Sequence, residues 1–134
     1  MNSNDLFGDT IYVYTRAQAI EDGVLIDVSE VAREAGFRLP VVVTSAVWEQ
    51  YISWSAEDSE KQAYQDESGR LWDVLWMLRV AASRCREQGV MFYELYVIRR
   101  NGRSRKPIKT QLKAVIGGGD QGEPVITIML PTED

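Results

Sequence analysis

The side chains with the clearest chemical potential in this sequence are cationic and lie close together. Seven basic residues and no acidic residue occupy positions 99–113. The planar donors of arginine suit phosphate and carboxylate groups, so this run predicts electrostatic contact with nucleic acid or with an acidic protein face. A solvated hairpin tip whose charges protect the sheet edges is the alternative, and the sequence leaves both interpretations open. The predicted partner-binding residues are Arg99, Arg100, Arg103, Arg105, Lys106 and Lys109.

The side chains on which most enzymes depend are missing or unsuitably placed. The chain has no histidine, which excludes Ser–His and Cys–His nucleophiles and most zinc and copper sites. Its one cysteine, Cys85, falls on the apolar face of a predicted helix, where a thiol is buried and unactivated. We therefore expect no catalytic residue, no cofactor-binding residue and no metal ligand, and a protein that is not an enzyme.

Three pairs of acidic residues are the remaining candidates for a carboxylate-dependent activity or for metal binding. Asp27 and Glu30 bracket a predicted cap, and Asp27 is interpreted as part of the turn into the next helix. Glu21 and Asp22 are adjacent on a predicted helix, so they diverge by about 100° around its axis and do not face each other. Asp120 and Glu123 lie in the segment GGGDQGE. A hairpin turn is the simpler interpretation of that segment, because a calcium loop needs a run of alternating oxygen ligands. Its glycines precede Pro124 and a strand instead of a helix, so they do not form a phosphate-binding loop.

The element that must carry much of the core is a helix predicted over Arg70–Gln88. Trp72 and Trp76 widen its apolar stripe, and we expect both rings in the core. Met77 and Val80 fall on the opposite, polar side and are candidates for a partner surface. The stripe itself recurs at steps of three and four residues, as on one face of a helix, and consists of Leu71, Leu75, Leu78, Ala82 and Cys85.

The sequence after this helix alternates between apolar and polar residues, as strands do. Asn101-Gly102 starts the first connection between these strands, and the triple glycine supplies the second. Arg99–Lys106 then lie at a hairpin tip that projects from the sheet as an arm, with Tyr93 and Tyr96 at its base. The predicted fold class is α+β, with a C-terminal three-stranded antiparallel meander packed on one long helix. The three strands are predicted at Met91–Arg100, Pro107–Ile116 and Pro124–Leu130.

Short helices and short strands are predicted in the N-terminal half. The helices are Arg16–Asp22 with Thr15 as its cap and Gly23 as its end, a second from a Ser29 cap to Gly36, and a third that begins at Thr44 or Ser45. Ile11–Tyr14 is predicted as a short strand, Val24–Ile26 as a short extended run, and Pro40–Val43 as a brief buried strand or an extended link.

The whole chain, residues 1–134, has the length of one domain, and we expect a single α+β domain. Residues 1–9 are expected to be a flexible N-terminus. Residues 55–69 form the most polar stretch and are predicted to be a surface loop or a loosely held helical turn, since Ser55 and Asp58 have capping-box spacing.

The net charge of −5 is divided unevenly along the chain. Residues 1–68 carry a net charge of −9 and residues 69–134 one of +4. This division either marks an interaction surface or is cancelled when folding brings the halves together, and both interpretations are open. A single cysteine, no long apolar run and a polar, acidic N-terminus predict a cytoplasmic protein.

Several segments resemble one family of small proteins. The most distinctive is YTRAQAIEDG at Tyr14–Gly23, and DESGRLWDVLWMLR and LKAVIGGGDQGEPVITIMLP extend the resemblance over nearly the whole chain. The family has no assigned function and is found on bacterial plasmids, integrative elements and phages. The resemblance therefore implies a mobile-element accessory protein in a bacterial host. Small proteins from such elements often inhibit host defence, so the setting and the size also imply an anti-CRISPR or related protein.

Two functions are expected from these observations. The first is a non-enzymatic inhibitory interaction protein that binds a host defence nucleoprotein complex, a suspected CRISPR–Cas effector, by placing acidic surfaces against its basic channels. The alternative is a nucleic-acid-binding accessory or regulatory protein of a plasmid or phage that contacts RNA or DNA through residues 99–113. Neither function requires a membrane.

Overall fold

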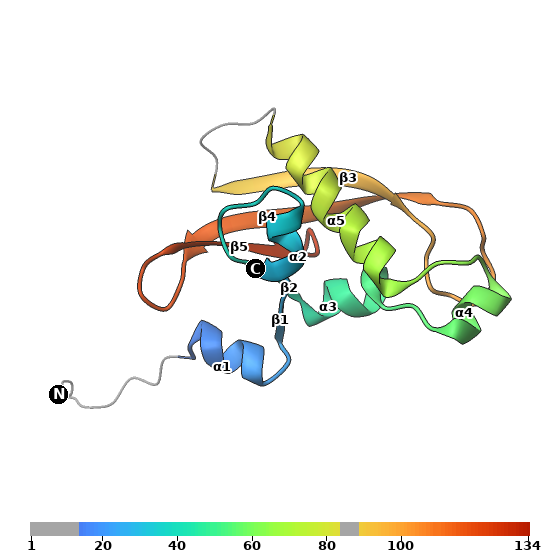
Figure 1. Ribbon diagram of the computed structural model, residues 1–134, viewed down its shortest axis with the longest axis horizontal. Helices are drawn as coiled ribbons and strands as arrows, with labels where there is room; N and C mark the ends of the chain where they lie inside the picture. Colours follow the sequence, from blue (N-terminus) through green and yellow to red (C-terminus); the bar gives the residue numbers. More distant parts are fainter. Residues whose placement is uncertain (1–13, 84–88) are drawn as a thin grey trace.

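The longest helix lies across one face of a five-stranded sheet in the computed structural model, which describes residues 14–83 and 89–134 (Figure 1). This helix, α5, spans Glu67–Ala82 and buries Leu71, Val74, Leu75 and Leu78, so the predicted apolar stripe is confirmed over these turns. It begins earlier than predicted because the Asp66 carboxylate accepts a hydrogen bond from Gly69 N at 2.8 Å and caps the first turn. The predicted continuation to Gln88, with Cys85, lies outside the described residues.

The sheet is larger than the predicted three strands. Its order is β1-β2-β5-β4-β3, and β2 pairs with β5 in parallel while the other neighbours are antiparallel. β2 is recruited because all four of its side chains are buried, which only a covered, central strand allows. The strands are β1 (Leu25–Asp27), β2 (Val41–Thr44), β3 (Val90–Val97), β4 (Ile108–Gly118) and β5 (Pro124–Met129).

The main core lies between the sheet and the helices on its inner face. Val41 and Val43 of β2, Ile126 and Ile128 of β5, and Leu112 of β4 point to this side. They meet the buried side chains of α5 and of α2 (Ser29–Glu34), which Figure 1 shows on the same side of the sheet. The prediction of a mixed α+β chain with one long helix and several short helices is therefore confirmed.

The short helices largely begin where their caps were predicted. Thr15 caps α1 (Arg16–Glu21) with reciprocal hydrogen bonds to Gln18, and Gly23 follows the helix at φ +79°. Thr44 caps α3 (Ser45–Val47), which continues as the π-helix η1 (Trp48–Ile52). The predicted Ser29 cap is wrong. The Ser29 hydroxyl is instead bonded to both backbone groups of Val41, and Val28 is the residue before α2.

The polar segment 55–69 is largely helical, so of its two predicted forms the helical turn is the one that the structure has. It holds α4 (Ala56–Lys61) and the start of α5. The predicted capping box is present, with Ser55 and Asp58 bonded to each other's backbone. Ser59 Oγ accepts from Trp54 Nε1 at 3.0 Å, which fixes α4 to the buried indole. The segment is polar because it lies at the surface, but its polar groups are used to hold it.

Two other expectations concern the surface and the N-terminus. The Trp76 ring is 44% exposed and stacks on Trp72, with ring centroids 5.9 Å apart, so the prediction that both rings lie in the core is wrong for Trp76.

The predicted strand Ile11–Tyr14, apart from Tyr14, and the predicted flexible residues 1–9 lie outside the described residues. In the part of the chain that the structure describes, no helix has the length and apolar character needed to cross a membrane.

Candidate functional site

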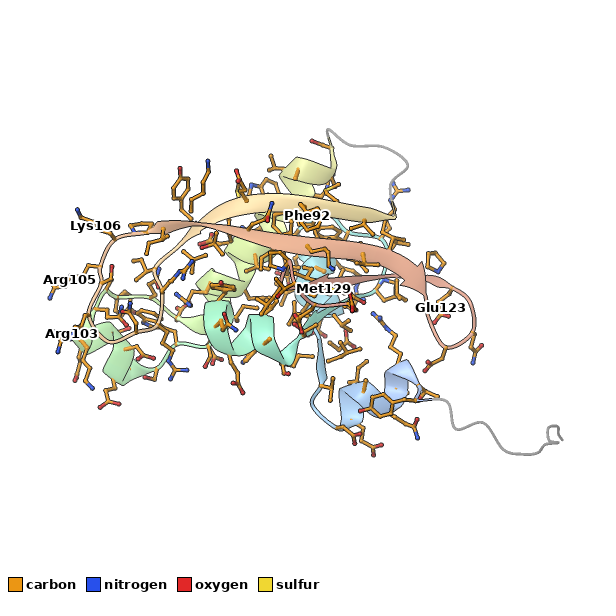
Figure 2. The ribbon with its side chains drawn as sticks, turned by 180° about the vertical axis from the view of Figure 1, so that it is seen from behind. Phe92, Arg103, Arg105, Lys106, Glu123 and Met129 are labelled. Atoms are coloured by element: carbon orange, nitrogen blue, oxygen red, sulfur yellow. The ribbon has the colours of Figure 1, made fainter. Side chains whose placement is uncertain are left out.

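The predicted partner-binding residues gather at one end of the sheet. Five of them lie on the connection between β3 and β4, residues 98–107, which we call the basic loop, and Lys109 follows on β4. Figure 2 shows Arg103, Arg105 and Lys106 along the outer margin of this loop, at the end of the molecule opposite Glu123. All three side chains are exposed.

A single buried amide holds the basic loop in place. The Gln62 side chain, 3% exposed, donates from Nε2 to the backbone oxygens of Arg99 at 2.8 Å and of Ser104 at 2.6 Å. Its Oε1 accepts from Gly102 N at 3.0 Å. The loop is therefore not the projecting arm predicted from the sequence, because Gln62 fastens its centre to the end of α4 (Figure 1).

The loop also stabilises its own turn. Asn101 Oδ1 accepts hydrogen bonds from the backbone N–H groups of Arg103 and Ser104, each at 3.2 Å, and Gly102 adopts φ +87°. An asparagine that bonds to the backbone two and three residues ahead is a common turn device. A positive φ at the next position is easy for glycine alone. Asn101-Gly102 therefore fixes the backbone from which the next arginines project.

Arg100 is the one arginine of the loop that turns back onto the protein. Its Nε lies 2.6 Å from Asp58 Oδ2, and its Nη1 donates to Ser53 Oγ at 2.9 Å. Hydrogen bonds from the Ser55 backbone and hydroxyl, together with Arg100, lower the pKa of the Asp58 carboxyl. This charge is committed to holding the loop against α4.

The other cations of the loop have no such partner. Within residues 14–83 and 89–134, no carboxylate lies within ion-pair distance of Arg99, Arg103, Arg105 or Lys106. Lys109 lies 3.6 Å from Glu94, but both side chains are more than half exposed, so this pair is weak and open to solvent. The structure thus leaves four positive charges free on a loop of fixed shape.

The two tyrosines at the base of the loop have different roles. Tyr93 is buried, donates from its hydroxyl to Val74 O at 2.9 Å, and has its pKa raised by burial. Tyr96 points to the opposite face of β3 and is 65% exposed. Tyr96 is therefore available to a partner at the edge of the basic loop.

A buried arginine supports the root of the loop and was not among the predicted residues. Arg70, 4% exposed, donates from Nη1 to Ile98 O at 2.8 Å and from Nε to Ile52 O at 3.1 Å. Its guanidinium lies 4.5 Å from the centroid of the Trp54 ring. Burial, with a further contribution from Arg100, lowers the pKa of Arg70 to about 10. Its sequence position, one residue before the apolar stripe, gave no sign of this structural role.

Arg70 borders a very small cavity. The cavity measures about 10 Å³ and is lined by Tyr51, Asp73 and Tyr96 as well. Arg70 Nη2 is buried and has no hydrogen-bond partner among the described residues. The volume is that of about one water molecule, so the cavity has room for a hydrating water and not for a substrate.

The acidic residues of GGGDQGE are used by the fold. Asp120 accepts hydrogen bonds from the backbone N–H groups of Arg16 at 2.7 Å and Ala17 at 3.0 Å, so it caps the first turn of α1. Glu123 Oε1 accepts from Gln121 N at 2.9 Å within the turn. Asp120 thus joins the β4–β5 turn to a helix more than a hundred residues away in sequence.

The remaining candidates for chemistry do not assemble into a centre. Asp22 accepts a hydrogen bond from the Tyr14 hydroxyl at 2.7 Å. No group of three or more His, Cys, Asp and Glu side chains that could hold a metal ion occurs in residues 14–83 and 89–134. Cys85, the one thiol, lies outside the described residues.

Folding leaves most of the charge division between the two halves of the chain unpaired. Of the ion pairs among the described residues, Asp58–Arg100 is the one that joins the acidic half to the basic half. Lys61–Glu57 and Lys109–Glu94 each stay within one half. The basic loop and the acidic residues of α4 therefore form neighbouring surfaces of opposite sign at one end of the molecule.

Comparison with known proteins gives a family and no function. No curated protein and no solved structure matches the chain. A family model, described as a family of unknown function, covers residues 1–134. This agrees with the predicted resemblance to a family without an assigned function, and the chain belongs to the family DUF6573.

Proposed function

We propose that this protein is a non-catalytic binding protein that contacts the phosphate backbone of nucleic acid through the basic loop. The observation that carries the proposal is the state of the loop: Arg99, Arg103, Arg105 and Lys106 have no ion-pair partner among the described residues, while the backbone that bears them is fixed by Gln62. Guanidinium groups donate to phosphate oxygens in a planar fork, which suits this ligand.

The way in which the loop is held favours ligand binding. Gln62 is neutral, so it orders the loop without cancelling the charge of the arginines. A loop that is ordered before binding loses less conformational entropy when the ligand arrives. A carboxylate in the place of Gln62 could not donate to the backbone oxygens of Arg99 and Ser104, and it would also lower the positive potential of the loop. Apart from the Arg100–Asp58 pair, the anchoring of the loop therefore does not use its positive charges.

The acidic remainder of the protein restricts where a polyanion can bind. With a net charge of −5, the protein repels nucleic acid over much of its surface and attracts it at the basic loop. Binding is then confined to one end of the molecule and a small number of phosphates. Each phosphate contact contributes about 0.7 to the steepness with which log K falls with log salt for a single strand. Because few phosphates are contacted, we expect the affinity to depend less on salt than that of a wholly basic protein.

The test is the salt dependence of oligonucleotide binding by the double variant Arg103→Gln/Arg105→Gln. We expect its affinity to fall about tenfold at low salt and the slope of log K against log salt to decrease by about 1.4. The matched control is Arg33→Gln/Arg38→Gln, which removes the same charge from exposed arginines elsewhere. Equal losses in the two variants, or no binding of DNA or RNA by the unmodified protein at low salt, would refute the proposal.

A second candidate is inhibition of a host defence nucleoprotein complex, of the anti-CRISPR kind, in the cytoplasm of a bacterium that carries a plasmid, integrative element or phage. The supporting observation is a row of exposed carboxylates beside the basic loop, from α4 and the start of α5. An acidic surface can occupy the basic channel of such a complex. Its residues are Glu57, Glu60, Asp66 and Glu67.

The two candidates differ in which surface matters. If the protein inhibits an effector, target binding by the purified effector falls in the presence of excess protein, and Glu60→Gln/Glu67→Gln restores it. If it binds nucleic acid through the basic loop, this acidic variant binds oligonucleotides at least as tightly as the unmodified protein does. An effector whose target binding is unchanged by excess protein would exclude inhibition of that effector.

A further inference from the structure

The outer face of the sheet, turned away from α5, consists of two unlike halves. The register sets which side chains it carries: Val42 of β2, Thr127 of β5 and Val115 of β4 are in register and point away from the core. Arg16 of α1 donates to Thr127 Oγ1 at 3.4 Å, so α1 lies on this outer face. The same face continues across β4 to the edge strand β3.

The half of this face over β2 and β5 is covered. Val42 is 1% exposed, and Met129 is also buried although it points outward. The C-terminal segment contributes to this cover, since Glu133 Oε1 accepts from Thr44 Oγ1 at 2.9 Å and from Leu130 N at 2.7 Å. The cover extends to the boundary with β4, where the Lys113 ammonium donates to the backbone oxygen of Glu133.

The half over β3 and β4 is open and carries two aromatic rings. Phe92 is 52% exposed and Tyr96 is 65% exposed. Both are on β3, with Glu94 between them on the same face. Lys109 is the cross-strand neighbour of Tyr96. Exposed rings of this size contribute nothing to the core, where Tyr93, Leu95 and Val97 from the same strand are buried.

This open half is continuous with the basic loop. Tyr96 and Lys109 are the last outward-facing pair before the loop. Phe92, labelled in Figure 2, lies two repeats of the alternation farther from the loop on the same strand. Phe92 and Tyr96 are four residues apart, about 13 Å along the strand. Stacked bases repeat about every 3.4 Å, so a single strand spans the distance between the two rings in about four steps.

We infer that the open half is a stacking platform for single-stranded nucleic acid, with the strand held by its phosphates at the basic loop and by base stacking on Tyr96 and then Phe92. This inference rests on the proposed function and gives it a ligand class. Single strands expose the faces of their bases, and aromatic rings on a sheet beside a cationic groove are a general solution for binding them. A duplex hides those faces and meets the loop alone.

Charge complementarity favours this occupant over a peptide or a second copy of the chain. The unpaired cations of the loop lie at the end of the platform nearest Tyr96. A second copy would bring a second set of like charges to the same surface, which costs free energy. Glu94 is the acidic residue among the outward-facing side chains of β3, and Lys109 lies 3.6 Å from it, so its charge is partly offset.

The experiment compares a single strand of dT or U of about 16 nucleotides with a duplex of the same length, measured by fluorescence anisotropy at low salt. We expect Tyr96→Ala and Phe92→Ala to weaken single-strand binding at least about tenfold each and to leave duplex binding unchanged. Tyr96→Phe should restore binding, because the ring and not the hydroxyl stacks. The control is Tyr64→Ala, which removes a ring that is 90% exposed but lies outside the platform. Thermal unfolding checks that each variant is folded.

The outcomes separate this inference from the proposed function. If Arg103→Gln/Arg105→Gln weakens binding while Tyr96→Ala and Phe92→Ala act like the Tyr64 control, the loop binds nucleic acid and the platform inference is wrong. Equal losses for single strand and duplex also overturn it. If Phe92→Ala and Tyr96→Ala dissociate a dimer in light scattering without changing single-strand binding, the platform holds a second copy and the inference is again wrong.

Discussion

The two turns that end the long strand β4 use their polar residues in opposite ways. At the β4–β5 turn, the Asp120 carboxylate is bonded to the first N–H groups of α1, and Glu123 is bonded within the turn. At the β3–β4 turn, the loop is held by the neutral Gln62 side chain, and most of its charges point to solvent. Both turns contain glycine, and both look like surface turns in the sequence.

The difference shows how to distinguish structural charges from charges that are free to bind. A charged group at a turn that completes another element, as Asp120 completes α1, is accounted for by stability. The cations of the basic loop complete nothing apart from the Arg100–Asp58 pair. No ion pair among the described residues accounts for the other cations of the loop, and a bound polyanion is the role that we propose for them.

Among the variants that test this contrast between the two turns, the largest loss of stability is expected from a change at Gln62, which anchors the basic loop. Gln62→Leu removes the hydrogen bonds to Arg99 O, Ser104 O and Gly102 N and leaves an apolar group against those polar atoms. We expect the free energy of unfolding to fall by about 2–3 kcal/mol and oligonucleotide binding to weaken with it. Urea unfolding at neutral pH measures the first quantity and anisotropy the second.

The control for this variant is Gln50→Leu, at an exposed glutamine of η1. If Gln62→Leu unfolds at the same urea concentration as the control, the amide is not the anchor of the loop. If stability falls but oligonucleotide affinity stays unchanged, the fixed shape of the loop is not needed for binding. Either result would contradict the statement that Gln62 holds the β3–β4 turn in the shape that binds a ligand.

A smaller effect is expected at the other turn. Asp120→Ala removes both acceptors from the N-terminus of α1 and should lower the free energy of unfolding by about 1 kcal/mol. Oligonucleotide affinity should not fall, because Asp120 lies at the opposite end of β4 from the basic loop. Gln121→Ala, in the same turn, serves as the control. A loss of affinity in Asp120→Ala without a loss of stability would show that this turn also belongs to the binding surface.

The elements with a strong local pattern could be predicted from the sequence. The apolar spacing from Leu71 to Leu78 and the Ser55–Asp58 spacing each appear in the structure as expected. The parallel pairing of β2 with β5 could not be predicted, since it joins Val41–Val43 to residues 85 positions away without a local signal. The prediction of a core position for Trp76 is wrong because periodicity gives the face of a helix but not what covers that face.

The candidate site was predicted as a set of residues but not as a geometry. Charge alone located the basic run, and the structure places its arginines on one loop. The roles of Gln62 and Arg70 were not predicted, because a buried polar residue is recognised by its partners, and these are backbone oxygens from distant segments. The predicted turn at Asp120 is confirmed, but its hydrogen bonds to α1 depend on a contact between segments more than a hundred residues apart.

The smallest effect is expected at Asp58, which forms an ion pair with Arg100 of the basic loop. The Asp58 carboxyl has a lowered pKa in the folded protein, first through its hydrogen bond from the Ser55 backbone and then through its contacts with the Ser55 hydroxyl and Arg100. A carboxyl whose folded pKa lies below its unfolded pKa, about 3.8, stabilises the protein above that value. The contribution is lost as the pH falls through the folded pKa, since the unfolded chain then binds more protons.

We therefore expect Asp58→Asn to reduce the loss of stability below about pH 4, in thermal unfolding measured at a series of pH values, while Glu60→Gln, an exposed neighbour, does not. The change should be small because the pair with Arg100 lies at the surface. At neutral pH the same variant frees Arg100, so the salt dependence of oligonucleotide binding should become slightly steeper. Unchanged acid sensitivity together with an unchanged salt slope would mean that Arg100 is as free as its neighbours and does not help to hold the basic loop.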